Sequence, residues 1–199
     1  MGILYLHEES SLRIIHRNLK ANNILLDNNM EPKIADSGMA ELLGEGNATA
    51  RTTRVVGTHG YMAPEYAMHG SVSPKIDVFS FGVMALEIVT GRSSSSSDDH
   101  GTENLLTDVW DHWTKGTMSR MLHGSLDGHA RRQALRCVHI GLLCVQPEPD
   151  DRPDMSAVVF MLTRDSMELQ PPSQPVLRPS SGENHLQLHW QSWGRSSCS

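Results

Sequence analysis

The residues best suited to chemistry lie in one stretch of the chain, residues 14–36, with the sequence IIHRNLKANNILLDNNMEPKIAD. Its polar loop, 16–23, contains a histidine, an arginine, a lysine and three asparagines. Two short strand-like runs, 24–26 and 33–35, follow on either side of a turn signal, and Asp36 ends the stretch. The pattern predicts a loop, a strand, a turn and a strand, with groups that can bind cations or phosphate at both ends.

This stretch resembles the catalytic loop and the metal-binding segment of the eukaryotic protein kinases. The family pattern is His-Arg-Asp-Leu-x-x-x-x-Asn followed by Asp-Phe-Gly. Two positions depart from it, because Asn18 stands in place of the catalytic Asp and Ser37 stands in place of the Phe. The matching positions are Lys20, Asn23, Asp36 and Gly38.

The resemblance implies that residue 18 decides whether the chain is active. In the family, the Asp at this position accepts the proton of the substrate hydroxyl. Asn18 has nearly the same shape, but it has no protonation equilibrium near neutral pH, and its NH2 group donates hydrogen bonds. Because a positioned general base contributes about 10²–10⁴-fold to the rate, we expect little or no phosphoryl transfer.

The resemblance also implies which residues would bind the family's cofactors, ATP and magnesium. Asn23 and Asp36 match the two magnesium ligands, and Lys20 matches the lysine that touches the transferred phosphate. Magnesium holds its water tightly and relies on substrate phosphates for further ligands, so we expect weak binding or none. Alternatively, Asn23 and Asp36 are satisfied by the backbone, and Lys20 is a solvated loop lysine.

His16 corresponds to a structural histidine that packs beneath the Phe of Asp-Phe-Gly in the family. Ser37 removes that contact. Because a change from Phe to a small residue in a core costs about 3–5 kcal/mol, we expect the metal-binding loop to be mobile.

Residues 57–65, with the sequence GTHGYMAPE, resemble the end of a kinase activation segment and follow a long polar loop. In kinases regulated by phosphorylation, the arginine at the position of Arg17 pairs with a phosphate on this segment. Thr58 lies at the family's substrate-docking position, and we expect it to be structural. The candidate phosphate acceptors are Thr49, Thr52 and Thr53.

The other elements are predicted to be helices that position these loops. Residues 3–9 fit the last turns of a helix, and 73–89 fit a buried central helix with Ser73 as its N-cap and Pro74 at its first position. Further helices are predicted at 105–113, 130–145 and 155–162. The resemblance assigns structural roles to Asp77 and to an ion pair between Glu65 and Arg152.

We therefore predict a mainly α fold, the C-lobe of a protein kinase, with short β-hairpins at the catalytic and metal-binding loops. The G-x-G-x-x-G and V-A-I-K motifs of the N-lobe do not occur in the sequence, so we expect the N-lobe to be absent. The predicted domain covers 1–164. Prolines and serines predict a disordered tail at 165–199, in which 185–190 is either a short binding motif or unstructured sequence.

Composition narrows the possibilities further. A chain of 199 residues is long enough for one domain, and a net charge of -6 without a long basic run argues against a nucleic-acid partner. The longest apolar run, 81–89, is too short to span a membrane. Cys137 and Cys144 are predicted to be buried thiols on one helix face, and Cys198 to be exposed. These features, with no secretory signal, predict a cytoplasmic protein.

Three runs narrow the resemblance to plant receptor-like Ser/Thr kinases with cysteine-rich or lectin-type ectodomains. These runs are YLHEESSLRIIHR, GYMAPEYAMHG and LRCVHIGLLCVQ. The favoured function is that of a truncated, catalytically inactive pseudokinase that binds other protein kinases or their substrates. The alternatives are a working Ser/Thr kinase and a gene fragment without function.

Overall fold

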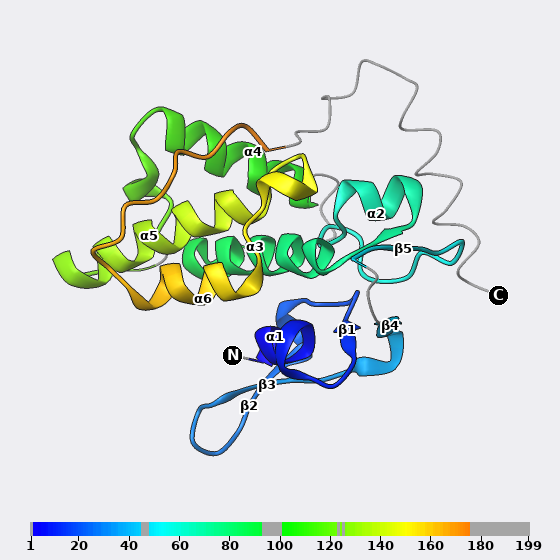
Figure 1. The fold of residues 1–199 in the computed structure, drawn as a ribbon. Helices are drawn as coiled ribbons and strands as arrows, with labels where there is room; N and C mark the ends of the chain where they lie inside the picture. Colours follow the sequence, from blue (N-terminus) through cyan, green and yellow to red (C-terminus); the bar gives the residue numbers. More distant parts are fainter. Residues whose placement is uncertain (1, 45–47, 93–100, 123, 125, 176–199) are drawn as a thin grey trace.

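The computed structural model describes residues 2–44, 48–92, 101–122, 124 and 126–175. Figure 1 shows a layer of helices that includes α3, α5 and α6, and a smaller region beside it that contains α1 and the first strands. The fold combines helices with short antiparallel strand pairs, which confirms the predicted combination of elements. The catalytic loop lies within the smaller region, and the chain from β4 to α2 leads from this region to the helices.

The helices predicted from the sequence are present. The α-helices of the described chain are α1 (Gly2–Leu4), α2 (Pro64–His69), α3 (Pro74–Thr90), α4 (Gly101–Thr114), α5 (Gly128–Cys144) and α6 (Met155–Thr163). A π-helical turn, Tyr5–Glu9, continues α1 and completes the helix predicted at 3–9. Only α2 was not predicted, although Pro64 begins it and the left-handed Gly70 ends it.

The central helix α3 begins and ends where the sequence predicts. Ser73 accepts a hydrogen bond from the backbone amide of Lys75 at 3.3 Å, and Pro74 is the first helical residue. Gly91 ends the helix with a φ of 68°, a conformation that favours glycine. Both caps are local signals, which explains why the sequence alone locates this helix.

Helix α5 packs closely against α3. A Cβ atom added at Gly82 would lie 2.7 Å from the Cβ of Cys144, and one added at Gly141 would lie 2.9 Å from Cδ2 of Leu86. The two glycines therefore allow the helices to approach more closely than larger residues would permit. Side chains of α3, α5 and their neighbours form the main hydrophobic core, with Val83, Leu86 and Leu142 fully buried.

Within the described part of the chain, the strands form three separate antiparallel pairs. They are β1 (Arg13–Ile15) with β4 (Glu41–Leu43), β2 (Ile24–Leu26) with β3 (Pro32–Ile34), and β5 (Ala50–Arg51) with β6 (Ser71–Val72). The β2–β3 hairpin matches the two predicted strand-like runs. The other two pairs were not predicted. Short 3-10 turns occur at Ala21–Asn23, Ser37–Met39, Met118–Arg120 and Pro149–Asp151.

The chain after α6 runs along α5, and we call residues 164–173 the strap. Arg136 donates hydrogen bonds to the carbonyl oxygens of Arg164 and Met167 at 2.7 and 2.9 Å, and Gln146 donates to the carbonyl oxygen of Ser173 at 3.0 Å. The strap is thus attached to the helices, although composition predicted a disordered tail from 165. The reason is that its backbone carbonyl oxygens accept hydrogen bonds from Arg136 on α5 and from Gln146 just beyond the end of α5, and composition does not reveal such contacts.

Two other predictions concern cysteines and the rest of the tail. Cys144 is buried, but Cys137 is only half-buried, so the prediction of two buried thiols was wrong for Cys137. Cys198 and the motif at 185–190 lie outside the described residues. Among the helices that the structure describes, none combines the length and the apolar character needed to cross a bilayer.

Candidate functional site

The loop at 16–18 is fastened to α3 by a buried aspartate. Oδ2 of Asp77 accepts hydrogen bonds from the backbone amide of His16 at 2.7 Å and from Nε2 of His7 at 2.9 Å, while Oδ1 accepts from the amide of Arg17 at 2.9 Å. Arg17 has a φ of 64°, which is uncommon for a residue with a Cβ. The charge-assisted bonds to Asp77 stabilise this backbone conformation and place residue 18.

The next residue, Asn18, lies in the middle of a chain of hydrogen bonds. Nζ of Lys20 donates to Oγ1 of Thr58 at 3.0 Å. The same hydroxyl donates to Oδ1 of Asn18 at 2.8 Å, and Nδ2 of Asn18 donates to Oδ2 of Asp36 at 3.1 Å. Lys20 is half-buried, and the fold brings Thr58 from the far end of the activation segment against it.

Asn23 adds a second amide to the same carboxylate. Its Nδ2 donates to the backbone carbonyl of Asn18 at 2.8 Å and lies 3.4 Å from Oδ2 of Asp36. A carbonyl and a carboxylate only accept hydrogen bonds, so these partners fix which end of each amide faces Asp36. The NH2 groups face it, and the amide oxygens do not.

This arrangement does not fit the magnesium site that the family implies. A magnesium ion needs oxygen ligands, but Asp36 is approached by the nitrogen ends of two amides. Among the described residues, no group of three histidine, cysteine, aspartate or glutamate side chains is placed to hold a metal ion. Of the two interpretations of Asn23 and Asp36 offered above, backbone satisfaction describes Asn23, whereas Asp36 is satisfied by side-chain amides.

His16 stays in place without the family's Phe. Its side chain is buried, Nε2 donates to the carbonyl oxygen of Ala35 at 3.1 Å, and Nδ1 accepts from the amide of Asn18 at 3.3 Å. Both ring nitrogens are therefore satisfied. Ser37 is exposed at the start of a 3-10 turn, so the lost aromatic contact has not left His16 without partners.

Arg17 is held by a carboxylate and a carbonyl. Its NH1 lies 2.9 Å from Oε2 of Glu41, and its Nε donates to the carbonyl oxygen of Met39 at 2.6 Å. Of the candidate phosphate acceptors, Thr49 and Thr53 are exposed. Thr52 is half-buried, and its backbone amide donates to the carbonyl oxygen of Gly70 at 2.9 Å.

The ion pair between Arg152 and Glu65 is present and bidentate, with nitrogen–oxygen distances of 2.7 and 2.9 Å. Arg152 is almost completely buried, and it also donates to the carbonyl oxygens of Gln146 and Pro147. Its guanidinium carbon lies 5.0 Å from the centre of the Phe79 ring. This arginine therefore joins the start of α2 to α3 and to the end of α5.

Sequence reasoning missed several residues that hold these loops. His7 and Glu41 are two of them, and Tyr66 is a third, because its hydroxyl donates to the carbonyl oxygen of Val56 at 3.0 Å and accepts from the Val56 amide at 2.9 Å. No local signal could have found these contacts, because each joins residues far apart in the chain or depends on the course of an irregular loop.

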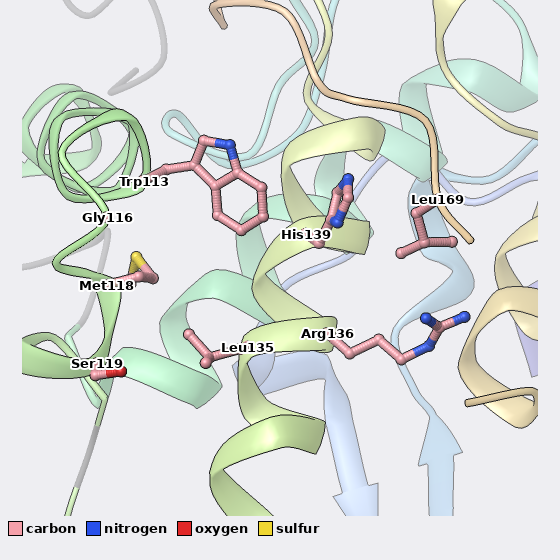
Figure 2. A pocket seen from close by; sticks show the side chains of 8 residues that line it. All are labelled: Trp113, Gly116, Met118, Ser119, Leu135, Arg136, His139 and Leu169. Carbon is pink, nitrogen blue, oxygen red and sulfur yellow. The ribbon is translucent and has the colours of Figure 1, made fainter. Parts of the chain in front are cut away.

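A cavity of about 410 Å³ lies apart from this site. Figure 2 shows it between the end of α4, α5 and the strap, with Trp113 and His139 on its walls. The two rings are tilted at 54°, with centroids 4.8 Å apart. Nε2 of His139 donates to the carbonyl oxygen of Gln170 at 2.7 Å, so the strap closes one side of the cavity.

The fold and the loops define the class of protein. The protein kinase domain family matches this chain over residues 1–159. The match covers the catalytic loop, the activation segment and the helices that hold them. The chain belongs to the protein kinase family.

The curated relatives narrow this class. The chain is 52% identical over 176 residues to cysteine-rich receptor-like protein kinase 8 of Arabidopsis thaliana, and the aligned region covers 87% of this chain and 26% of the relative. It is 50% identical over 177 residues to cysteine-rich receptor-like protein kinase 6 of Oryza sativa subsp. japonica, with coverages of 88% and 26%. A G-type lectin S-receptor-like serine/threonine-protein kinase of Arabidopsis thaliana is 48% identical over 185 residues, with coverages of 92% and 22%. The chain spans about a quarter of the length of these relatives.

Proposed function

We propose that this chain is the C-lobe of a receptor-like Ser/Thr kinase domain and works as a non-catalytic binding module in phosphorylation signalling. One observation carries the proposal: the amide of Asn18 donates to Asp36 at 3.1 Å. An amide thus occupies the position at which the family has its proton-accepting carboxylate. The NH2 group of this amide faces the carboxylate that binds magnesium in the family. We expect ATP and magnesium to bind weakly or not at all.

The proposed binding surface is the segment 57–68, which includes α2. Three contacts hold it: Thr58 is bonded to Asn18, Tyr66 to the backbone of Val56, and Glu65 to Arg152. Met68 is exposed on α2. A fixed backbone that presents an exposed apolar side chain can bind a partner without first paying for the ordering of a loop.

The proposed partners are other protein kinases or their substrates. Thr49 and Thr53 are exposed near the same segment, so an active kinase can reach their hydroxyls. Because Asn18 cannot act as a base, we propose that these threonines are phosphorylated only in trans. Lys20 and Arg17 then act as positioning residues for the loop rather than as contacts to a transferred phosphate.

The test has two measurements on the purified chain. Incubation with radiolabelled ATP, magnesium and a generic hydroxyl substrate should give no transfer above a protein-free blank. Incubation with the active kinase domain of a cysteine-rich receptor-like kinase should label Thr49 or Thr53, and the double variant Thr49→Ala/Thr53→Ala should lose that label. Transfer by the chain alone would establish a working kinase instead.

A second pair of variants tests the binding surface. Met68→Glu should weaken binding to the same active kinase domain by about tenfold or more, because a central apolar contact contributes more than about 1 kcal/mol. Ile88→Glu is the matched control, since Ile88 is also exposed but lies near the other end of α3. Equal affinities for both variants would reject this surface. A chain that shows no cooperative unfolding would support the gene-fragment alternative.

A further inference from the structure

We infer that the cavity between α4, α5 and the strap is a second binding surface, which takes an acidic peptide segment of a partner protein with one large apolar side chain. The inference goes beyond the proposed function, because it concerns a surface apart from 57–68. It holds whether or not the chain transfers phosphate.

The cavity has the size and the lining of a pocket for one large apolar side chain. Its volume of about 410 Å³ falls within the range of small-ligand pockets, about 300–1,000 Å³. Figure 2 shows Trp113 pointing from α4 towards α5 and Leu135 pointing from α5 towards α4. Gly116 and Ser119 also line the cavity and are exposed, so a peptide can enter from solvent. The apolar lining residues are Trp113, Met118, Leu135 and Leu169.

The polar groups at the cavity favour a ligand that accepts hydrogen bonds. Within the described part of the chain, neither the indole N–H of Trp113 nor the hydroxyl of Ser119 has a hydrogen-bond partner. A peptide offers carbonyl and carboxylate oxygens, which accept hydrogen bonds from such groups. An aromatic side chain of the peptide can pack against the ring of Trp113.

Positive charge lies beside the cavity, and we call Arg120, Arg131 and Arg132 the arginine rim. All three are exposed, and none forms an ion pair with another residue that the structure describes. Arg131 and Arg132 precede Leu135 and Arg136 by four residues each, so they lie on the same side of α5, one turn nearer its start. Arg120 directly follows Ser119.

The acidic residues near the start of α5 do not neutralise this rim. Oδ1 of Asp127 accepts from the backbone amides of His129 and Ala130 at 2.9 and 2.8 Å, and Asp111 pairs with Lys115 at 3.0 Å. The whole chain has a net charge of -6, so the rim is a local positive region on an acidic protein. Arginine binds carboxylates through two parallel hydrogen bonds, which makes an acidic ligand the complementary one.

Charge also favours a separate partner over the chain's own tail. Residues 176–199 contain two arginines, Arg178 and Arg195, and one acidic residue, Glu183, so their net charge is +1. This charge has the same sign as the arginine rim. Complementary charge speeds association and excludes wrong partners, so the occupant that fits is an acidic segment of another protein.

Fluorescence polarisation with labelled peptides tests the inference on the full chain. The probes are the fluorescein-labelled peptides EDEGWGS and SGWGEDE, which place the acidic residues before and after the apolar anchor. At least one should bind with a dissociation constant of about 100 µM or tighter, and binding should weaken at high salt because exposed charges are screened. Alanine in place of the tryptophan should weaken binding about tenfold or more, and lysines in place of the acidic residues should abolish it.

Variants of the chain separate the rim from the cavity. Arg131→Glu/Arg132→Glu should weaken probe binding about tenfold or more, and glutamate is tolerated near the start of a helix. Arg13→Glu/Arg51→Glu is the matched control, because it changes the net charge equally at exposed positions of β1 and β5. Ser119→Trp fills the mouth of the cavity and should also weaken binding, with the rim intact, whereas Ser119→Ala should bind almost as the wild type does.

Several results would overturn the inference. They are the absence of saturable binding by either probe, equal binding of the lysine peptides, and equal affinities of the two double variants. A chain that sediments as a dimer and dissociates when the probe is added would identify a second copy as the occupant. Probe binding that appears only in Trp190→Ala/Trp193→Ala would identify the tail.

The same assay distinguishes this inference from the proposed function. Met68→Glu alters the surface at 57–68 and should leave the affinity for the probes unchanged. Phosphate transfer by the chain alone would reject the proposed function without affecting probe binding, and loss of probe binding would leave the proposed function intact.

Discussion

Two aspartates lie on either side of the loop at 16–18, and they hold it in different ways. Asp77 is fully buried and accepts hydrogen bonds from the backbone amides of His16 and Arg17. Asp36 is exposed and accepts from the side chain of Asn18. The first contact is independent of which side chain occupies position 18, whereas the second depends on it completely.

The comparison explains how a chain can keep a fold while its chemistry changes. Asp77 and Arg152 are buried and fasten loops through backbone groups or a bidentate ion pair, so replacing either should strongly destabilise the fold. Asn18 and Ser37 replace family residues on the Asp36 side of the loop. The polar side chains of Asn18 and Asn23 form other hydrogen bonds there. Variants of Arg152, Asp77 and Asp36 test this difference, and variants of Gly82 and Cys144 test the helices that support the buried side.

The largest effect is expected for Arg152→Ala. The substitution leaves Glu65 without its bidentate partner and removes the contact with Phe79. Removal of one partner from a buried ion pair costs about 3–5 kcal/mol, so the free energy of unfolding should fall by that amount in urea denaturation. An Arg152→Ala variant as stable as the wild type would show that this arginine does not stabilise the fold.

Asp77→Asn should cost somewhat less, about 2–4 kcal/mol in the same measurement. The variant keeps one oxygen, but its NH2 group would face either the backbone amide of Arg17 or both the amide of His16 and Nε2 of His7, all of which donate to Asp77. Asp36→Asn is the matched control on the other side of the loop. A loss as large for Asp36→Asn as for Asp77→Asn would remove the distinction between the two aspartates.

Gly82→Ala tests the close packing of α3 against α5. The new methyl group would lie 2.7 Å from the Cβ of Cys144 and 2.9 Å from the carbonyl oxygen of Gly141. Because overpacking of a core costs about 1–3 kcal/mol, the urea midpoint should fall. Gly116→Ala is a control without crowding, since nothing lies within 4 Å of its Cβ position, although the φ of 65° at Gly116 adds some strain.

The buried thiol of Cys144 predicts an alkaline loss of stability. Burial raises its pKa from 9.0 to about 12, so the unfolded chain ionises first. The contribution of the neutral Cys144 thiol to the free energy of unfolding is complete below about pH 9 and is lost as the pH rises towards about 12. Near pH 10 the free energy of unfolding should be lower by about 1 kcal/mol. Cys144→Ala should reduce the difference in unfolding free energy between about pH 7.5 and pH 10 by this amount. An unchanged difference would show that the thiol titrates equally in both states.

The smallest effect is expected for Asp36→Asn. An amide at this position can still accept from Asn18, and asparagine tolerates the left-handed φ of 61°. Exposed positions usually change stability by less than about 1 kcal/mol, and urea denaturation should show a change of that size. A loss above about 2 kcal/mol would mean that the exposed aspartate supports the fold as strongly as the buried one.

The sequence predicted those features that depend on local signals. Ser73, Pro74 and Gly91 define both ends of α3 without any knowledge of the fold, and the turn between β2 and β3 is also contained in a short segment. The pairing of Arg152 with Glu65 was available from the family resemblance, because both residues lie in recognisable motifs.

Contacts between distant segments that lie outside the recognised motifs were not predictable. The pairing of β1 with β4 joins strands of three residues across an intervening hairpin, and such short strands have no clear periodicity. The bond from Lys20 to Thr58 requires the activation segment to fold back on the catalytic loop. The strap was predicted to be disordered because composition does not show that Arg136 can bind its carbonyl oxygens.

The central claim is that Asn18 leaves the site closed to magnesium and unable to transfer phosphate. Isothermal titration of the purified wild-type chain with magnesium–ATP tests it most directly. No measurable heat of binding is expected up to about 1 mM ligand. A dissociation constant near about 1 µM, equivalent to about −8.2 kcal/mol, would contradict the account.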